Sequence, residues 1–159
     1  MNTPADSPSD PEPDEHRRFA RYQQELAQVA PEAEIAVIRA ILSDPDDVMA
    51  DAALVGHLDH RAAQLLTEAT FPDWAFRMSA TIANRDFLTR RLNEWTLLRS
   101  IVLNTAWTTE SVLAASNWFQ YKATDLASTP AALTLLATHG RTRRIRAAAI
   151  RRLTQREHT

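Results

Sequence analysis

The sequence between Trp74 and Leu153 repeats a similar pattern four times, and this constrains the fold more than any other feature. Three cycles open with a tryptophan, at Trp74, Trp95 and Trp118, and a fourth opens with Arg144. Successive starts lie 21, 23 and 26 residues apart. A period of this length is typical of stacked repeats, in which each unit buries its apolar face against its neighbours. The repetition predicts an array of similar units and implies no chemistry by itself.

The units are predicted to be helical. The chain of 159 residues has only two glycines, Gly56 and Gly140, which argues against a sheet with tight hairpins. Alanine, leucine and arginine, which favour helices, are abundant. Four prolines follow a break and precede a segment of helical periodicity, as expected in the first turn of a helix: Pro31, Pro45, Pro72 and Pro130. We therefore expect an all-α fold, with more than about 65% helix and no sheet.

Helical periodicity predicts short helices joined by short links. The first covers about 15–30, and others begin near residues 31, 45, 60 and 72. Further helices cover about 86–93, 95–104, 109–116, 117–127, 130–138 and 142–156. Asp44 and Thr129 are expected to cap the helices that follow them. Short helices on short links form antiparallel hairpins, so the sequence predicts a superhelical solenoid of about five stacked hairpins.

Three parts of the chain resemble variant leucine-rich repeats, which are close relatives of HEAT-type repeats. The stretch 128–150 is similar to a repeat in which a Thr-Pro-initiated helix with a Leu-x-x-Leu-Ala core precedes an Arg-bearing helix. The segments 74–77 and 82–84 resemble the family's Trp-x-x-Arg and Ala-x-Asn phrases, and 108–113 resembles the Thr-Pro-initiated one. The resemblance covers about 45–153 and lacks the cysteine cluster of some members. It implies a scaffold and not a reaction.

Charge and composition vary strongly along the chain. Residues 1–15 hold four prolines and five acids, which predicts a disordered tail before a single helical domain spanning 16–159. Residues 1–73 carry fifteen acidic and five basic residues, whereas 74–159 carry five and thirteen. We expect an acidic end and a basic end. Without cysteines, an apolar run of about 18 residues or signal-peptide features, a cytoplasmic protein that does not contact membranes is expected.

No stretch matches a catalytic motif, and neither enzymatic activity nor a cofactor is expected. His57 and His60 lie one helical turn apart with Asp59 between them, and two such ligands could begin a zinc site. A third ligand and the glutamate of His-Glu-x-x-His are missing, so two surface histidines beside a capped helix start are favoured. A metal-dependent or hydrolytic enzyme built on these histidines is the most distant alternative.

Clustered acids have similarly simple interpretations. Asp44, Asp46 and Asp47 lack the spacing of a calcium loop, and they are expected to cap a helix and meet its positive end. Asp86 and Glu94 lie on separate turns and are expected to be surface charges.

The three tryptophans that open repeats have two interpretations. The favoured one places them in the core, each packed against the next cycle's helix, because equal spacing is what packing requires. The alternative is a binding groove lined by aromatic and basic side chains: Trp74, Arg77, Trp95, Arg99, Trp118, Tyr121 and Lys122. Such surfaces occur at protein interfaces and in single-stranded nucleic acid sites.

The C-terminal segment concentrates seven arginines: Arg141, Arg143, Arg144, Arg146, Arg151, Arg152 and Arg156. Its expected buried stripe is Ile145, Ala148, Ala149, Leu153 and Ile150. Arg144 and Arg151 are seven residues apart and so share a helix face. This face could meet an acidic protein surface, meet phosphates, or keep a terminal cap solvated.

These observations favour a non-enzymatic protein-interaction or adaptor protein that binds its partner through a helical-repeat groove. The expected partner is another protein with an acidic surface, or the acidic end of a second copy. A nucleic-acid-binding HEAT-like protein that uses its arginine-rich C-terminal helices is the alternative, against which the net charge of −2 argues.

Overall fold

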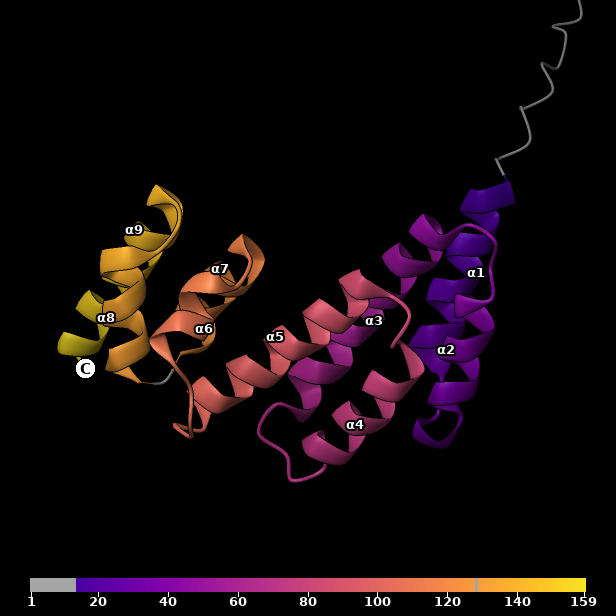
Figure 1. The fold of residues 1–159 in the computed structure, drawn as a ribbon, viewed down its shortest axis with the longest axis horizontal. Coiled ribbons are helices and arrows are strands. Elements are labelled where there is room, and N and C mark those ends of the chain that lie inside the picture. Colours follow the sequence, from indigo (N-terminus) through magenta and orange to yellow (C-terminus); the bar gives the residue numbers. More distant parts are fainter. Residues whose placement is uncertain (1–13, 128) are drawn as a thin grey trace, which may run out of the picture. The chain divides into compact units, whose positions relative to one another are not determined.

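The computed structural model describes residues 14–127 and 129–159 and confirms the all-α prediction (Figure 1). The described part of the chain is 79% helical and contains no strand. Its elements are α1 (Asp14–Gln28), the 3-10 helix η1 (Pro31–Ala33), α2 (Glu34–Leu42), α3 (Asp47–Leu65), α4 (Phe71–Thr81), α5 (Asp86–Val102), α6 (Thr109–Ala114), α7 (Asn117–Leu126), α8 (Pro130–His139) and α9 (Arg143–Glu157). Most of the predicted tail lies outside the described residues, and Asp14 and Glu15 already belong to α1.

The chain divides into two compact units, Met1–His57 and Leu58–Thr159. The boundary falls inside α3. In the first unit α1 packs against α2. In the second, α4 packs against α5, α5 against α7, and α6 against α8, while α7, α8 and α9 pack against one another (Figure 1). None of the helices described here is long and apolar enough to cross a bilayer.

Two predicted breaks between helices are wrong. The helix expected to begin near residue 60 is the second half of α3, and 86–93 and 95–104 form the single helix α5. The stretch 86–104 contains neither proline nor glycine, and Gly56, which precedes the other expected break, is accommodated inside α3. In α5 the buried residues Leu88, Leu92 and Trp95 continue one apolar stripe through the expected break. Trp95 therefore lies inside its helix, whereas Trp118 lies in the first turn of α7.

The predicted caps are partly wrong. The side chain that caps α3 belongs to Asp46, whose carboxylate accepts a 3.0 Å hydrogen bond from the backbone N–H of Met49. Asp44 lies two residues earlier and holds the preceding loop instead. Thr129 occupies the N-cap position of α8, but its hydroxyl makes no capping hydrogen bond. Prolines do occupy the first turns of three elements as expected: Pro31, Pro72 and Pro130.

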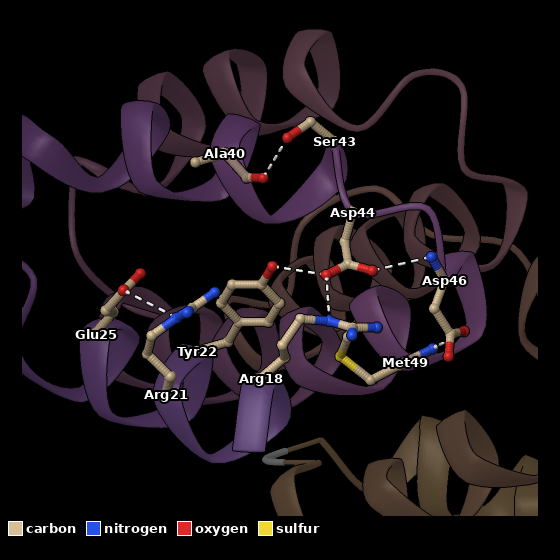
Figure 2. A network of polar contacts seen from close by, with 9 residues as sticks. All are labelled: Arg18, Arg21, Tyr22, Glu25, Ala40, Ser43, Asp44, Asp46 and Met49. Carbon is tan, nitrogen blue, oxygen red and sulfur yellow. Dashed lines mark hydrogen bonds and ion pairs between the residues drawn. The ribbon is translucent and has the colours of Figure 1, made fainter. Parts of the chain in front are cut away.

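Asp44 fixes α1 to the loop between α2 and α3 (Figure 2). Its buried carboxylate accepts hydrogen bonds from the Asp46 amide at 2.9 Å, the Tyr22 hydroxyl at 2.7 Å and Nε of Arg18 at 3.0 Å. The Asp46 and Tyr22 hydrogen bonds, aided by the Arg18 charge, hold the pKa of Asp44 below its usual value of 3.8. The hydrogen bond to Asp44 and then burial raise the pKa of Tyr22 above 10.0. Two separate backbone segments, α1 and the loop between α2 and α3, are thereby joined at one carboxylate.

The C-terminal helices pack closely around Gly140. A Cβ at this position would lie 2.5 Å from the carbonyl oxygen of Leu136 and 2.8 Å from Cγ2 of Ile145. Ile145, Ala148 and Ala149 form the buried stripe of α9 as predicted. The prediction was wrong for Ile150, whose side chain is 53% exposed because its position turns away from α7 and α8. Leu153, also placed in the predicted stripe, is only half-buried.

Candidate functional site

The tryptophans predicted to open repeats differ in exposure. Trp74 is 3% exposed and Trp95 is 1% exposed, so both rings belong to the core, as the favoured interpretation has it. Trp118 is half-buried. The Trp95 and Trp118 rings meet edge to face, with centroids 5.5 Å apart, whereas Trp74 contacts Phe71 at 5.6 Å. Two of the three rings are thus unavailable to line a binding groove.

Asp59 organises the contact between Trp95 and Trp118. One carboxylate oxygen accepts a 2.7 Å hydrogen bond from Nε1 of Trp95, and the other pairs with Arg91 at 2.8 Å. The Arg91 guanidinium in turn lies 3.7 Å from the centroid of the Trp118 ring. A buried indole N–H needs an acceptor, and Asp59 supplies it. Sequence reasoning treated Asp59 only as part of a histidine cluster and missed this role.

Arg99 and Lys122 also support the core. Nη1 of Arg99 donates to the carbonyl oxygens of Leu66 and Glu68, at 2.5 and 3.0 Å, and its guanidinium lies 5.2 Å from the Phe71 ring. Arg99 therefore ties α5 to the segment that follows α3. Lys122 is half-buried and its Nζ lies 5.8 Å from the Trp95 ring.

Arg77 is exposed on α4, next to Phe76, whose side chain is 78% exposed. The structure thus does not bring the seven predicted groove residues together into one groove.

A different set of predicted residues shares one surface. Arg144 stacks on Tyr121 of α7, with its guanidinium carbon 4.6 Å from the ring centroid. Arg144 and Arg151 are both exposed, and at 100° per residue they lie within about 20° of each other around α9. Arg143 and Ile150 lie on the same exposed side of the helix. We call these five residues, Tyr121, Arg143, Arg144, Ile150 and Arg151, the basic face.

The arginines at the edges of this surface are held by backbone carbonyls. Arg141 donates to Leu113, Arg146 to Gly140 and Arg152 to Asp125, at 3.2, 2.6 and 3.1 Å. Carbonyl contacts position a guanidinium without neutralising its charge. Across residues 14–127 and 129–159, none of the seven arginines from 141 to 156 forms an ion pair with a carboxylate.

Gln120 supports the same region from inside. This fully buried side chain donates to the carbonyls of Val112 and Leu113 and accepts from the Arg141 amide at 2.9 Å. These three hydrogen bonds satisfy the side-chain amide of Gln120, which would destabilise the fold if it were buried without partners. It joins the end of α6 to the start of the segment that leads into α9.

The prediction of a surface histidine is right for His60 and wrong for His57, and both residues lie inside α3 instead of beside a helix start. His57 is buried inside α3, with Nε2 2.7 Å from Oε1 of Glu34. His60 is exposed. Because only part of the α3 surface is buried, two histidines one helical turn apart can lie in different environments. Within the described residues, no three His, Asp or Glu side chains are grouped to hold a metal ion.

Asp86 and Glu94 line a groove of about 500 Å³ between α5 and the α6 segment. Its walls are Asp86, Thr89, Arg90, Asn93, Glu94, Leu97, Ser111, Ala114 and Ala115. Asp86 is exposed as expected, but the prediction for Glu94 was wrong, because Glu94 is only 7% exposed. Its carboxylate accepts hydrogen bonds from the amide and hydroxyl of Ser116, at 3.0, 2.8 and 2.7 Å.

Comparisons with protein-family models, with curated proteins and with solved structures gave no match. The basic face offers fixed positive charge, one aromatic ring and one exposed aliphatic side chain, which suits recognition of an anionic surface.

Proposed function

We propose that this protein is a non-enzymatic interaction protein whose basic face binds an acidic surface on another protein. The observation that carries the proposal is the exposed Arg144 stacked on Tyr121, beside Arg151 and without a neutralising carboxylate among the described residues. Arginine and tyrosine are enriched among the residues that dominate protein interfaces. Stacking fixes the guanidinium in advance, which lowers the entropy cost of binding.

The charge of the second unit supports an anionic partner. Residues 58–159 carry fourteen basic and eight acidic residues, a net charge of +6. From residue 130 onward there are seven arginines and a single acid, Glu157. A field of one sign steers an oppositely charged partner toward the surface. Ile150 adds the apolar contact that the centre of a protein interface needs.

The tryptophans of the predicted groove and the one aromatic ring of the basic face are buried or covered, which favours a protein partner over a single-stranded nucleic acid. Non-specific single-strand sites stack successive bases on exposed aromatic rings. Here Trp74 and Trp95 are buried, Arg91 covers Trp118, and Arg144 covers Tyr121. A duplex would need only phosphate contacts, but the first unit, with four basic and twelve acidic residues, would repel it.

The finer architecture belongs to the same proposal. We infer a HEAT-like or variant leucine-rich-repeat solenoid of about five hairpins, from the repeated sequence pattern and from the packing of consecutive helices such as α4 with α5 and α8 with α9. A cytoplasmic location is inferred from the absence of cysteine. A second copy of the chain, through its first unit of net charge −8, is the alternative acidic partner.

Quantitative affinity capture tests the proposal. Nuclease-treated extract of the native host is passed over the wild-type chain, over the double variant Arg144→Glu with Arg151→Glu, and over the control Arg39→Glu with Arg77→Glu. Both double variants change the net charge equally, and all four arginines are exposed. We expect an acidic protein, or the chain itself, to be retained by the wild type and the control and lost from the Arg144 and Arg151 variant.

Equal retention by all three chains would contradict the proposal, since the basic face would then be irrelevant to binding. A parallel run with untreated extract completes the test, and retention that occurs only without nuclease would favour the nucleic-acid alternative. Circular dichroism of each variant verifies that helix content is unchanged, as expected for exposed positions.

A further inference from the structure

The face of α5 that lines the α5–α6 groove is polar and largely exposed, and Glu94 is its one buried member. Positions 86, 89, 90, 93, 94 and 97 follow helical spacing and form one stripe, and Leu97 is its one large apolar member. The facing wall consists of short side chains, Ser111, Ala114 and Ala115. Short side chains opposite a polar stripe leave the open volume of about 500 Å³.

Glu94 is a nearly buried carboxylate without a cationic partner. Its hydrogen bonds all come from Ser116, a neutral residue. No arginine, lysine or histidine of the described chain lies within ion-pair distance of it. Ser116 is the N-cap of α7, so the positive end of that helix offsets part of the charge. Buried glutamates are usually paired with a cation, and this one faces an open groove.

Three further polar side chains in the groove make no polar contact with the described residues. Asp86, Arg90 and Asn93 have no hydrogen-bond or ion-pair partner among the residues that the structure describes. Asp86 and Arg90, and likewise Arg90 and Glu94, are four residues apart, so acid, base and acid follow one another along the stripe. At 1.5 Å per residue, the successive charges are spaced by about 6 Å along the helix axis.

We propose that this groove binds an extended peptide of a partner protein with the charge pattern basic-x-acidic-x-basic. In an extended chain, side chains two residues apart point the same way and are separated by about 6.6 Å. This spacing matches that of Asp86, Arg90 and Glu94, so each charge of the peptide would meet its opposite. Two carboxylates disfavour a phosphate ligand, and the walls contain no aromatic ring on which a sugar or base could stack. The site uses different helices from the basic face and is independent of the proposed function.

Titration of the full chain with acetyl-Lys-Ala-Glu-Ala-Lys-amide, followed by amide chemical shifts, tests this inference. We expect saturable shifts centred on Ser111, Ala114 and Ala115. The charge-inverted peptide acetyl-Glu-Ala-Lys-Ala-Glu-amide should bind at least several-fold more weakly. Asp86→Asn should weaken the first peptide by about two- to fivefold, the range for one exposed ion pair. Ala114→Leu, which fills the groove, should abolish binding.

The matched control is Asp73→Asn, because Asp73 is likewise exposed and lies in the first turn of its helix, α4. It should leave peptide binding unchanged. An Asp86→Lys variant should bind acetyl-Glu-Ala-Glu-Ala-Lys-amide more tightly than the wild type does. No saturable shift with the wild type, equal binding of both peptides, or equal effects of Asp73→Asn and Asp86→Asn would overturn the proposal.

Discussion

Replacing Trp95 by phenylalanine isolates the hydrogen bond that holds the tryptophan pair of the second unit. Trp95 is 1% exposed, and its N–H donates to the Asp59 carboxylate at 2.7 Å. Phenylalanine keeps most of the buried apolar ring but has no donor. A hydrogen bond to a charged group contributes about 1.5–3 kcal/mol, and the smaller ring leaves a void that adds to the cost. We expect Trp95→Phe to lower the free energy of unfolding by about 2–3 kcal/mol, and Trp95→Ala by about 3–5 kcal/mol.

Urea denaturation of the wild type, Trp95→Phe, Asp59→Ala and the double variant measures this prediction. Because the two side chains are in contact, the double variant should lose less than the sum of the single losses, with a coupling of about 0.5–3 kcal/mol. Trp107→Phe is the control, since Trp107 is only half-buried, and it should cost under about 1 kcal/mol. A loss below about 0.5 kcal/mol for Trp95→Phe, or strictly additive losses, would refute the role assigned to Asp59.

Three further outcomes are expected. Asp44 has a pKa below 3.8, so its contribution to stability is present above that value and is lost as the pH falls below it. Tyr22 has a pKa above 10.0, so its contribution is present below pH 10 and is lost as the pH rises further; Asp44→Asn should flatten both losses in melts recorded across pH. Gly140→Ala should destabilise the chain by about 1–3 kcal/mol in denaturant melts, because the new methyl group overlaps Leu136. Gly56→Ala, in a helix and with open space around it, should stabilise by about 0.5–1 kcal/mol, and any loss there would be contrary to the helix-propensity argument.

The sequence predicted helix type and most helix starts because these depend on local chemistry. Proline in a first turn and a threonine hydroxyl ahead of an amide act within a few residues, as Thr108 does for Ser111. The apolar spacing of Ile145, Ala148 and Ala149 likewise gave the buried side of α9. The break predicted before Trp95 was wrong because the repeat alone suggested it and no helix-breaking residue supports it. The break predicted near residue 60 was wrong because a single glycine, Gly56, is tolerated inside α3.

The polar contacts could not be predicted, because their partners are far apart in the chain. Asp59 and Trp95 are separated by 36 residues, and Glu34 and His57 by 23. Neither pair has a local motif, and Asp59, Glu34 and His57 each resemble surface residues when taken alone. Glu94 gave a weak signal, because it belongs to a polar stripe on a helix that also carries the apolar stripe of Leu88, Leu92 and Trp95. An apolar stripe and a separate polar stripe on the same helix indicate that two sides of α5 have distinct surroundings.

The assignment of the basic face to an acidic protein partner is tested most directly by competitive binding in solution. Fluorescence anisotropy is recorded with a labelled acidic peptide and with single-stranded DNA of equal charge, at two salt concentrations. We expect the wild type to bind the acidic peptide more tightly at both concentrations, and Arg144→Glu with Arg151→Glu to abolish that binding while helix content is retained. Tighter binding of DNA, with affinity falling steeply with salt and lost in the double variant, would contradict the assignment.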